Sequence, residues 1–194
     1  TTGIIAPKER LITGQKLRDG DHIIAAASSG IHANGISLVI KKTMELNDKF
    51  LTKLPNGKTI GEEVLIPTRS YVALVEALLE NGIDVHALLP GTGDGVGKIA
   101  FDKRPHTYRI HSWLKVPELF RYFSEQLGVP LKDCLKTFNW GAGYYIYAPE
   151  SQADKILSIG SRAGYELRDV GIVEPGERQV IFEPEDIILM PPGE

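Results

Sequence analysis

Apolar residues along this chain follow two alternating patterns. Residues 22–27 form a compact apolar run between turn-forming residues, which is typical of a buried strand. In residues 35–46 the apolar positions instead recur every three or four residues, which predicts a helix with one buried face. We expect that face to consist of Ile36, Val39, Ile40 and Met44.

The same two patterns repeat toward the C-terminus. Further strands are predicted at 83–89, 108–111, 142–148, 165–173 and 179–182, and further helices at 68–80, 117–127 and 150–159. Residues 47–62 are polar and include a Pro-Asn-Gly turn, so we expect a surface insertion there. The sequence therefore predicts an α/β (α+β) fold, a mixed β-sheet with packed helices.

Composition narrows the class of protein. With 194 residues, of which 42% are hydrophobic and 24% charged, the chain suits one ordinary soluble domain. The net charge of -3 comes without a basic cluster, which argues against a nucleic-acid partner. No apolar run approaches the roughly 20 residues of a membrane helix, and Cys134 is the single cysteine. We expect no membrane partner and a cytoplasmic location.

The first candidate for chemistry is the polar segment 28–35 between a predicted strand and a predicted helix. It holds the hydroxyls of Ser28 and Ser29, the imidazole of His32 and the amide of Asn34. Free backbone N–H groups at the start of a helix suit a phosphate. The alternative is that Ser28 and Asn34 cap and turn the chain while His32 lies in solvent.

The second candidate is the segment 90–97, which has four glycines in eight residues. Such a backbone can approach a ligand closely, although the segment matches neither a P-loop nor a dinucleotide fingerprint. A plain connection is the alternative, and Asp94 in it is either a ligand contact or a turn former.

The third candidate is the segment 137–143, where Asn139 precedes a predicted strand. Its amide either contacts a polar ligand or forms a turn. Arg69 is a possible phosphate contact, with a surface ion pair as the alternative. His86, His106 and His111 lack the spacing of metal ligands, so no metal site is predicted in this chain. We expect the three candidate segments to converge at one edge of the sheet and make part of a nucleotide-substrate cleft.

Taken together, these segments resemble the aminoimidazole ribonucleotide synthase (formylglycinamidine ribonucleotide cyclo-ligase) family. Residues 28–38 are similar to its Ser-Ser-Gly-x-His-Ser-Asn-Gly-x-Ser-Leu segment, with Ala33 where a serine is usual. Residues 67–72 resemble its Pro-Thr-Arg-x-Tyr-Val segment, and 137–143 its third signature. At 89–95 the chain departs from the usual His-Ile-Thr-Gly-Gly-Gly, because no histidine is present there.

The resemblance implies a division of the chain and of its cofactors. Residues 1–20 would be an interdomain linker or the start of the domain, and residues 21–194 the C-terminal α/β domain. The start at Thr1, without methionine, is then explained by a cut at the linker. ATP and Mg²⁺ would be held mainly by an N-terminal ATP-binding domain that is absent here, and that domain and a second copy of the protein would be its partners.

The implied activity is an ATP-dependent ring closure in purine biosynthesis, with a ribonucleotide as the substrate. His32 would serve in proton transfer or phosphate contact, and Asn34 and Asn139 would orient amide groups. The implied binding residues are Ser28, Ser29, Gly30, Arg69, Gly91, Thr92, Gly93, Asp94, Gly95 and Thr137. The alternatives are another ATP-dependent member of the superfamily, such as a selenophosphate synthetase or a hydrogenase maturation factor, and a non-catalytic binding or dimerisation module. The isolated domain would be inactive.

Overall fold

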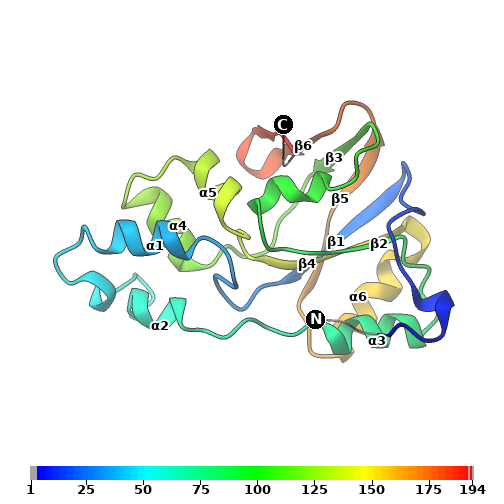
Figure 1. Ribbon diagram of the computed structural model, residues 1–194, viewed down its shortest axis with the longest axis horizontal. Helices are drawn as coiled ribbons and strands as arrows, with labels where there is room; N and C mark the ends of the chain where they lie inside the picture. The colour runs from blue at the N-terminus through cyan, green and yellow to red at the C-terminus, as the bar shows by residue number, and fades with distance from the viewer. Residues whose placement is uncertain (1–3, 192, 194) are drawn as a thin grey trace.

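The computed structural model describes residues 4–191 and 193, and in that part of the chain seven strands form one sheet (Figure 1). Their order is β2-β4-β1-β5-β3-β6-β7. All neighbours are antiparallel except β3 and β6, so the sheet is mixed, as predicted. The strands are β1 Asp21–Ala27, β2 Ala87–Pro90, β3 His106–Ile110, β4 Ala142–Pro149, β5 Leu167–Pro175, β6 Gln179–Phe182 and β7 Ile187–Leu189.

Strand β1 is an inner strand, between β4 and β5, and is buried on both faces. Its side chains alternate, as those of any strand do. Ile23 and Ala25 belong to one apolar core, and Ile24 and Ala26 belong to a second. A strand covered on both sides reads as a continuous apolar run, which is why it could be predicted from the sequence.

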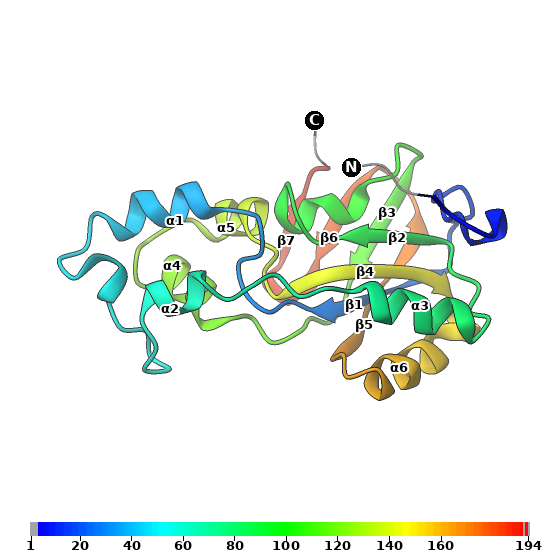
Figure 2. The same cartoon turned by 60° about the horizontal axis from the view of Figure 1, so that its bottom comes forward.

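Two helices cover one face of the sheet. They are α3 Val72–Glu80 and α6 Ala153–Arg162, which lie next to each other in Figure 2. Leu74 and Leu78 of α3 pack with Ile156 and Ile159 of α6 and with Ile24 of the sheet. Helix α3 ends at Asn81 and Gly82, whose φ of 66° is left-handed, as predicted for a glycine stop.

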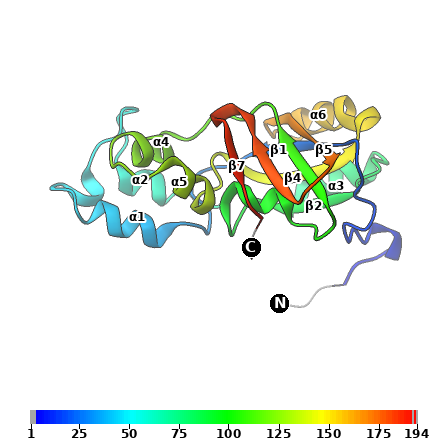
Figure 3. The same cartoon turned by 90° about the horizontal axis from the view of Figure 1, so that it is seen from above.

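The remaining α-helices form a lobe beside the sheet (Figure 3). They are α1 Ile36–Thr43, α2 Ile60–Val64, α4 Glu118–Glu125 and α5 Leu131–Thr137. Short 3-10 helices are η1 Lys8–Arg10, η2 Lys49–Leu51, η3 Gly95–Ala100, η4 Glu150–Gln152 and η5 Glu183–Glu185. No helix within the described residues is long and apolar enough to span a membrane.

The predicted helix at 35–46 exists, but its predicted buried face is wrong. Ile36, Ile40 and Met44 are 43%, 46% and 50% exposed, and Val39 is the apolar residue of α1 that is fully covered. Helix α1 lies at the outer edge of the lobe, where it contacts the rest of the chain along a narrow strip. Periodicity therefore identified the helix without revealing how little of it is covered.

The predicted surface insertion at 47–62 is also corrected, because it folds and contributes to the core. Leu54 is 3% exposed and Ile60 is fully buried. Thr59 and Glu62 form a capping box, in which each side chain bonds the other's backbone N–H and fixes the start of α2. Helix α5 and strand β7 were not predicted, and Thr68 does not cap α3, which begins after Tyr71.

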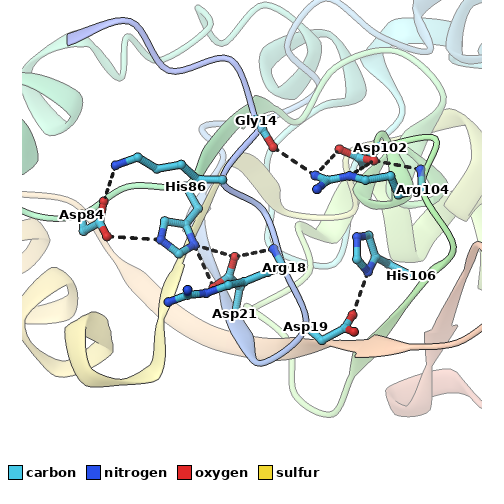
Figure 4. Close-up of polar contacts among 10 residues, drawn as sticks. Gly14, Arg18, Asp19, Asp21, Asp84, His86, Asp102, Arg104 and His106 are labelled. Carbon is cyan, nitrogen blue, oxygen red and sulfur yellow. Dashed lines mark hydrogen bonds and ion pairs between the residues drawn. The ribbon is translucent and has the colours of Figure 1, made fainter. Parts of the chain in front are cut away.

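The segment before β1 is fixed to the domain by polar contacts (Figure 4). Three of them join residues distant in sequence: Lys16 Nζ to Asp84 at 2.6 Å, Arg104 Nη2 to the carbonyl of Gly14 at 3.2 Å, and His106 Nδ1 to Asp19 at 2.7 Å. Leu17, 1% exposed, adds an apolar anchor. Residues 14–19 of the predicted linker are thus held against the domain.

The position of Cys134 leads to a first prediction. Its thiol is buried in the lobe, and burial raises its pKa to about 11. Because the thiolate is the reactive form, a thiol reagent at about pH 8 should modify the native chain at least about 100-fold more slowly than the chain unfolded in denaturant. Comparable rates in the two states, followed by absorbance with a disulfide reagent, would contradict the described packing of α5.

Candidate functional site

The three candidate loops meet at the start of β4. The N–H of Ser28, in the first loop, donates to the carbonyl of Gly141 at 2.8 Å. The N–H of Gly91, in the second loop, donates to the carbonyl of Gly143 at 2.9 Å. The third loop therefore forms the centre of the arrangement, with the other two on either side of it.

Asn139 links the first and third loops. Its side chain is 1% exposed, and its Nδ2 donates to the carbonyls of Gly30 and Ile31 at 2.8 and 3.3 Å. Its Oδ1 accepts the N–H of Gly141 at 2.9 Å. Because both amide hydrogens and the carbonyl oxygen are used inside the protein, the expectation that Asn139 presents its amide to a ligand is corrected. It positions the loops instead.

Asn34 is a second side chain that joins two of the loops. Its Nδ2 donates to the carbonyl of Thr137 at 3.0 Å, so this side chain also connects the first loop to the third. Gly35, with a φ of 83°, lies against Phe138, where a Cβ would come within 2.6 Å of the ring. The close approach of the loops therefore depends on the glycine as well as on the two asparagines.

His32 adopts a left-handed backbone conformation, with a φ of 56°, and its imidazole is half-buried. The N–H of Ser29 donates to His32 Nε2 at 3.1 Å. The Ser29 hydroxyl donates to the carbonyl of Pro67 at 2.8 Å and accepts the N–H of Arg69 at 3.1 Å. Nε2 is thus an acceptor, and the neutral ring carries its hydrogen on Nδ1, where it is a donor.

A pocket of about 400 Å³ opens beside His32. Its lining comes from the first two loops, from the segment 68–71 before α3, from α3 itself and from β4: His32, Ala33, Thr68, Arg69, Tyr71, Val72, Val75, Glu76, Pro90, Thr92, Gly143 and Tyr144. Of the residues predicted from the sequence, His32, Arg69 and Thr92 line this pocket. The other predicted residues do not line it: Ser28, Ser29, Gly30, Asn34, Gly91, Gly93, Asp94, Gly95, Thr137 and Asn139.

Two tyrosines form an apolar wall of the pocket. Tyr71 and Tyr144 stack with ring centroids 5.2 Å apart and planes 22° apart. The Tyr71 hydroxyl donates to the carbonyl of Ala27 at 2.8 Å, and burial raises the pKa of Tyr71 to about 12, so the phenol stays protonated. The sequence analysis missed this wall, because the strand-forming residues of β4 identified a strand without indicating which face borders a pocket.

Because Gly143 has no side chain, its backbone lines the pocket directly. A Cβ at this position would lie 1.9 Å from the Tyr71 hydroxyl oxygen and 2.6 Å from His32 Cε1. These are shorter than any ordinary contact, so the pocket in its present shape requires glycine here. The glycine pattern of the third loop was visible in the sequence, but its role was not.

Arg69 contacts protein groups on the side of the pocket. Its guanidinium lies 4.3 Å from the centroid of the Tyr165 ring, and its Nη2 donates to the carbonyl of Gly164. A cation over an aromatic ring is attracted to the ring face. These contacts hold the guanidinium in place. Arg69 can therefore contact a ligand only through the outer edge of the guanidinium.

A cation that the sequence analysis did not consider directly follows the second loop, in η3. Lys98 Nζ donates to the carbonyl of Thr92 inside the glycine-rich turn. Gly93, Asp94 and Gly95 have consecutive φ values of 73°, 60° and 57°. This left-handed run lets the loop fold back on itself, which brings the ammonium next to the pocket-lining Thr92.

The environment of His32 leads to a prediction about pH. Burial lowers the pKa of His32 below its ordinary value of 6.5. The unfolded chain then binds a proton more readily than the folded one, so the contribution of neutral His32 to stability is complete above about pH 6.5 and is lost as the pH falls toward the lowered pKa. His32→Asn, which tolerates a left-handed backbone, should reduce the loss of stability between about pH 7.5 and about pH 5.5. An unchanged pH dependence in denaturant titrations would exclude His32 as its source.

Comparison with known proteins agrees with this arrangement. Residues 18–97 match the family model described as AIR synthase related protein, C-terminal domain. A phosphoribosylformylglycinamidine cyclo-ligase from Carboxydothermus hydrogenoformans is 32% identical over 186 residues, which are 92% of this chain and 53% of that protein. One from Clostridium acetobutylicum is 34% identical over 179 residues, which are 89% of this chain and 51% of that protein. The chain is similar to the C-terminal domain of AIR synthase related proteins.

Solved structures share the fold. The hydrogenase maturation protein HypE is similar with a TM-score of 0.64 at 20% identity, over 98% of this chain and 58% of HypE. A structure of HypE in complex with ATP matches with a TM-score of 0.59 at 20% identity, over 92% of this chain and 52% of that one. At this identity the likeness concerns the fold alone. The chain spans about half the length of the curated relatives it matches.

Proposed function

We propose that this chain supplies the C-terminal half of an ATP-dependent cyclo-ligase that converts formylglycinamidine ribonucleotide to aminoimidazole ribonucleotide. The observation that carries the proposal is the convergence of the three loops, the first and third of which hold family-like segments, on a pocket lined by His32, Thr92 and Gly143. The remaining family-like segment, 67–72, lines the same pocket with Thr68, Arg69 and Tyr71. The relatives named as cyclo-ligases at 32% and 34% identity support the choice of reaction over the other activities of this fold.

The proposed reaction activates an amide and then closes a ring. ATP transfers its terminal phosphoryl group to the formyl amide oxygen of the substrate. The amidine nitrogen then attacks the formyl carbon, a C–N bond forms, the C–O bond to the phosphate breaks, and phosphate and a proton are released. The protein must hold the two reacting groups together and stabilise charge on the phosphoryl oxygens.

Residue roles follow from the atoms that are free. His32 has its Nδ1 hydrogen available while Nε2 accepts from Ser29, so it suits hydrogen-bond donation to a phosphoryl oxygen. Lys98 and the loop Gly91–Gly95 are next to the pocket wall at Thr92, and together they suit an anion. Asn34 and Asn139 act as positioning residues, since their amides hold the first loop against the third.

ATP and Mg²⁺ are proposed to be held mainly by an N-terminal half that lies outside this chain. Arg69 and His32 are the basic side chains in the pocket lining, which supplies little positive charge for a triphosphate. Within the described residues, no group of three His, Cys, Asp or Glu side chains is arranged to hold a metal ion. We therefore assign no step through Mg²⁺ to this chain. A homodimer and a cytoplasmic location complete the proposal.

The test uses the chain alone and joined to the ATP-binding half of a cyclo-ligase. Calorimetry of the chain alone should detect binding of formylglycinamidine ribonucleotide, and a coupled assay should detect no ADP release. The joined protein should form aminoimidazole ribonucleotide. ATP turnover by the chain alone would contradict the division into halves. A chain that binds neither the ribonucleotide nor ATP in calorimetry would favour a non-catalytic module. ADP release by the joined protein with a different substrate would favour another member of the superfamily.

A further inference from the structure

Helix α3 turns one face toward the pocket. Val72, Val75 and Glu76 follow the i, i+3, i+4 spacing of neighbours on a helix, and all three line the pocket. The two valines extend the apolar wall, and Val72 is 63% exposed, so a ligand from solvent can reach this face. Glu76 is the carboxylate among the pocket-lining residues.

The Glu76 carboxylate has no protein partner in the described part of the chain. No hydrogen bond or ion pair joins it to another described residue. Arg69, the guanidinium in the same lining, instead contacts the Tyr165 ring and the Gly164 carbonyl. A carboxylate therefore borders a largely apolar cavity without an ion-pair partner, since Arg69 is directed to Tyr165 and Gly164 instead.

Tyr144 supplies an aromatic surface to the same pocket. Tyr71 covers one face of its ring by stacking, and the ring is half-exposed where it lines the pocket. Helix α3, which carries Glu76, runs along β4, which carries Tyr144 (Figure 2). Aromatic ring faces attract cations, and nearby apolar groups strengthen such attraction by excluding water.

We infer that Glu76 and Tyr144 recognise a planar cation, the amidinium end of the substrate. A flat amidinium stacks on a ring and directs a fork of two N–H groups at a carboxylate, as a guanidinium does. A neutral amide of the same shape forms no ion pair with Glu76, so the wall selects by charge. The inference rests on the proposed function, whose substrate carries an amidine that is protonated at neutral pH, and it makes Glu76 a specificity-determining residue.

The test compares benzamidine with benzamide, which have nearly the same shape and differ in charge. Nuclear magnetic resonance titrations of the chain should give at least about tenfold tighter binding of benzamidine, with shifts at Tyr144 and Glu76. Glu76→Gln should bring the two affinities within about threefold of each other. Glu80→Gln is the matched control, because it removes the same charge from the same helix outside the pocket, and it should keep the preference.

A second variant tests the aromatic contribution. Tyr144→Leu keeps the wall apolar but removes the ring face, so benzamidine should lose several-fold in affinity while benzamide loses less. Equal binding of the two probes, or a preference that survives Glu76→Gln, would overturn the inference.

Titration with the ribonucleotide separates this inference from the proposed function. If the ribonucleotide binds the wild-type chain and Glu76→Gln equally well, the recognition of its amidinium by Glu76 is excluded while the proposed function stands. If benzamidine is preferred but the ribonucleotide does not bind the wild-type chain, the cation-selective wall stands and the proposed function fails.

Discussion

Replacing Asn139 with alanine should lower the free energy of unfolding by about 2–4 kcal/mol. The change leaves the carbonyls of Gly30 and Ile31 and the N–H of Gly141 without their partner in a part of the protein that water does not reach. A buried polar group that loses its hydrogen bond costs more than the bond itself contributes, and here three groups lose theirs together. Urea denaturation followed by tryptophan fluorescence measures the effect.

Asn81→Ala provides the control for this prediction. Asn81 also donates its amide to a backbone carbonyl, that of Ala77 at 2.8 Å, but it lies at the exposed end of α3. Water replaces its hydrogen bond, so the loss should stay below about 1 kcal/mol. Similar losses for the two variants would contradict the role of Asn139 as the buried link between the loops.

Replacing Gly143 with alanine should reduce ribonucleotide affinity at least about tenfold and destabilise the chain by about 1–3 kcal/mol. The added Cβ overlaps the Tyr71 hydroxyl and the His32 ring, so one of the two side chains must move into the pocket or away from its hydrogen bond. Calorimetric titration gives the affinity, and thermal unfolding gives the stability.

Gly30→Ala separates a general effect of added bulk from the specific overlap. A Cβ on Gly30 meets atoms no closer than 3.6 Å, which is ordinary contact. Its stability should therefore remain within about 0.5 kcal/mol of the wild type. If Gly143→Ala is as stable as Gly30→Ala and binds the ribonucleotide normally, the pocket is not the binding site.

The fold class followed from the sequence because the central strand is covered on both faces. Ile23 to Ala26 are all buried, so they form a run that only a strand or a core helix explains. The helical lobe was harder to predict. Leu54 and Ile60 are isolated apolar residues in a polar stretch, and their burial depends on contacts with distant helices that no local pattern encodes.

The candidate loops were found from their polar and glycine-rich composition, but the pocket between them was not. Local patterns pointed to His32 and Thr92, which line it. They did not separate these residues from Asn34 and Asn139, which hold the loops together, because an asparagine in a loop has the same appearance in either role. Tyr71, Tyr144 and Glu76 were missed because the pocket depends on how α3 packs beside β4.

The most direct test of the account is a titration of the chain with formylglycinamidine ribonucleotide, followed through backbone amide resonances. The account predicts that the shifted resonances cluster at His32, Thr92, Gly143 and Tyr144, the contributions of the three loops and β4 to one pocket. Resonances that do not shift, or that shift only around the distant hollow lined by Lys16, Asp84 and His86, would contradict it.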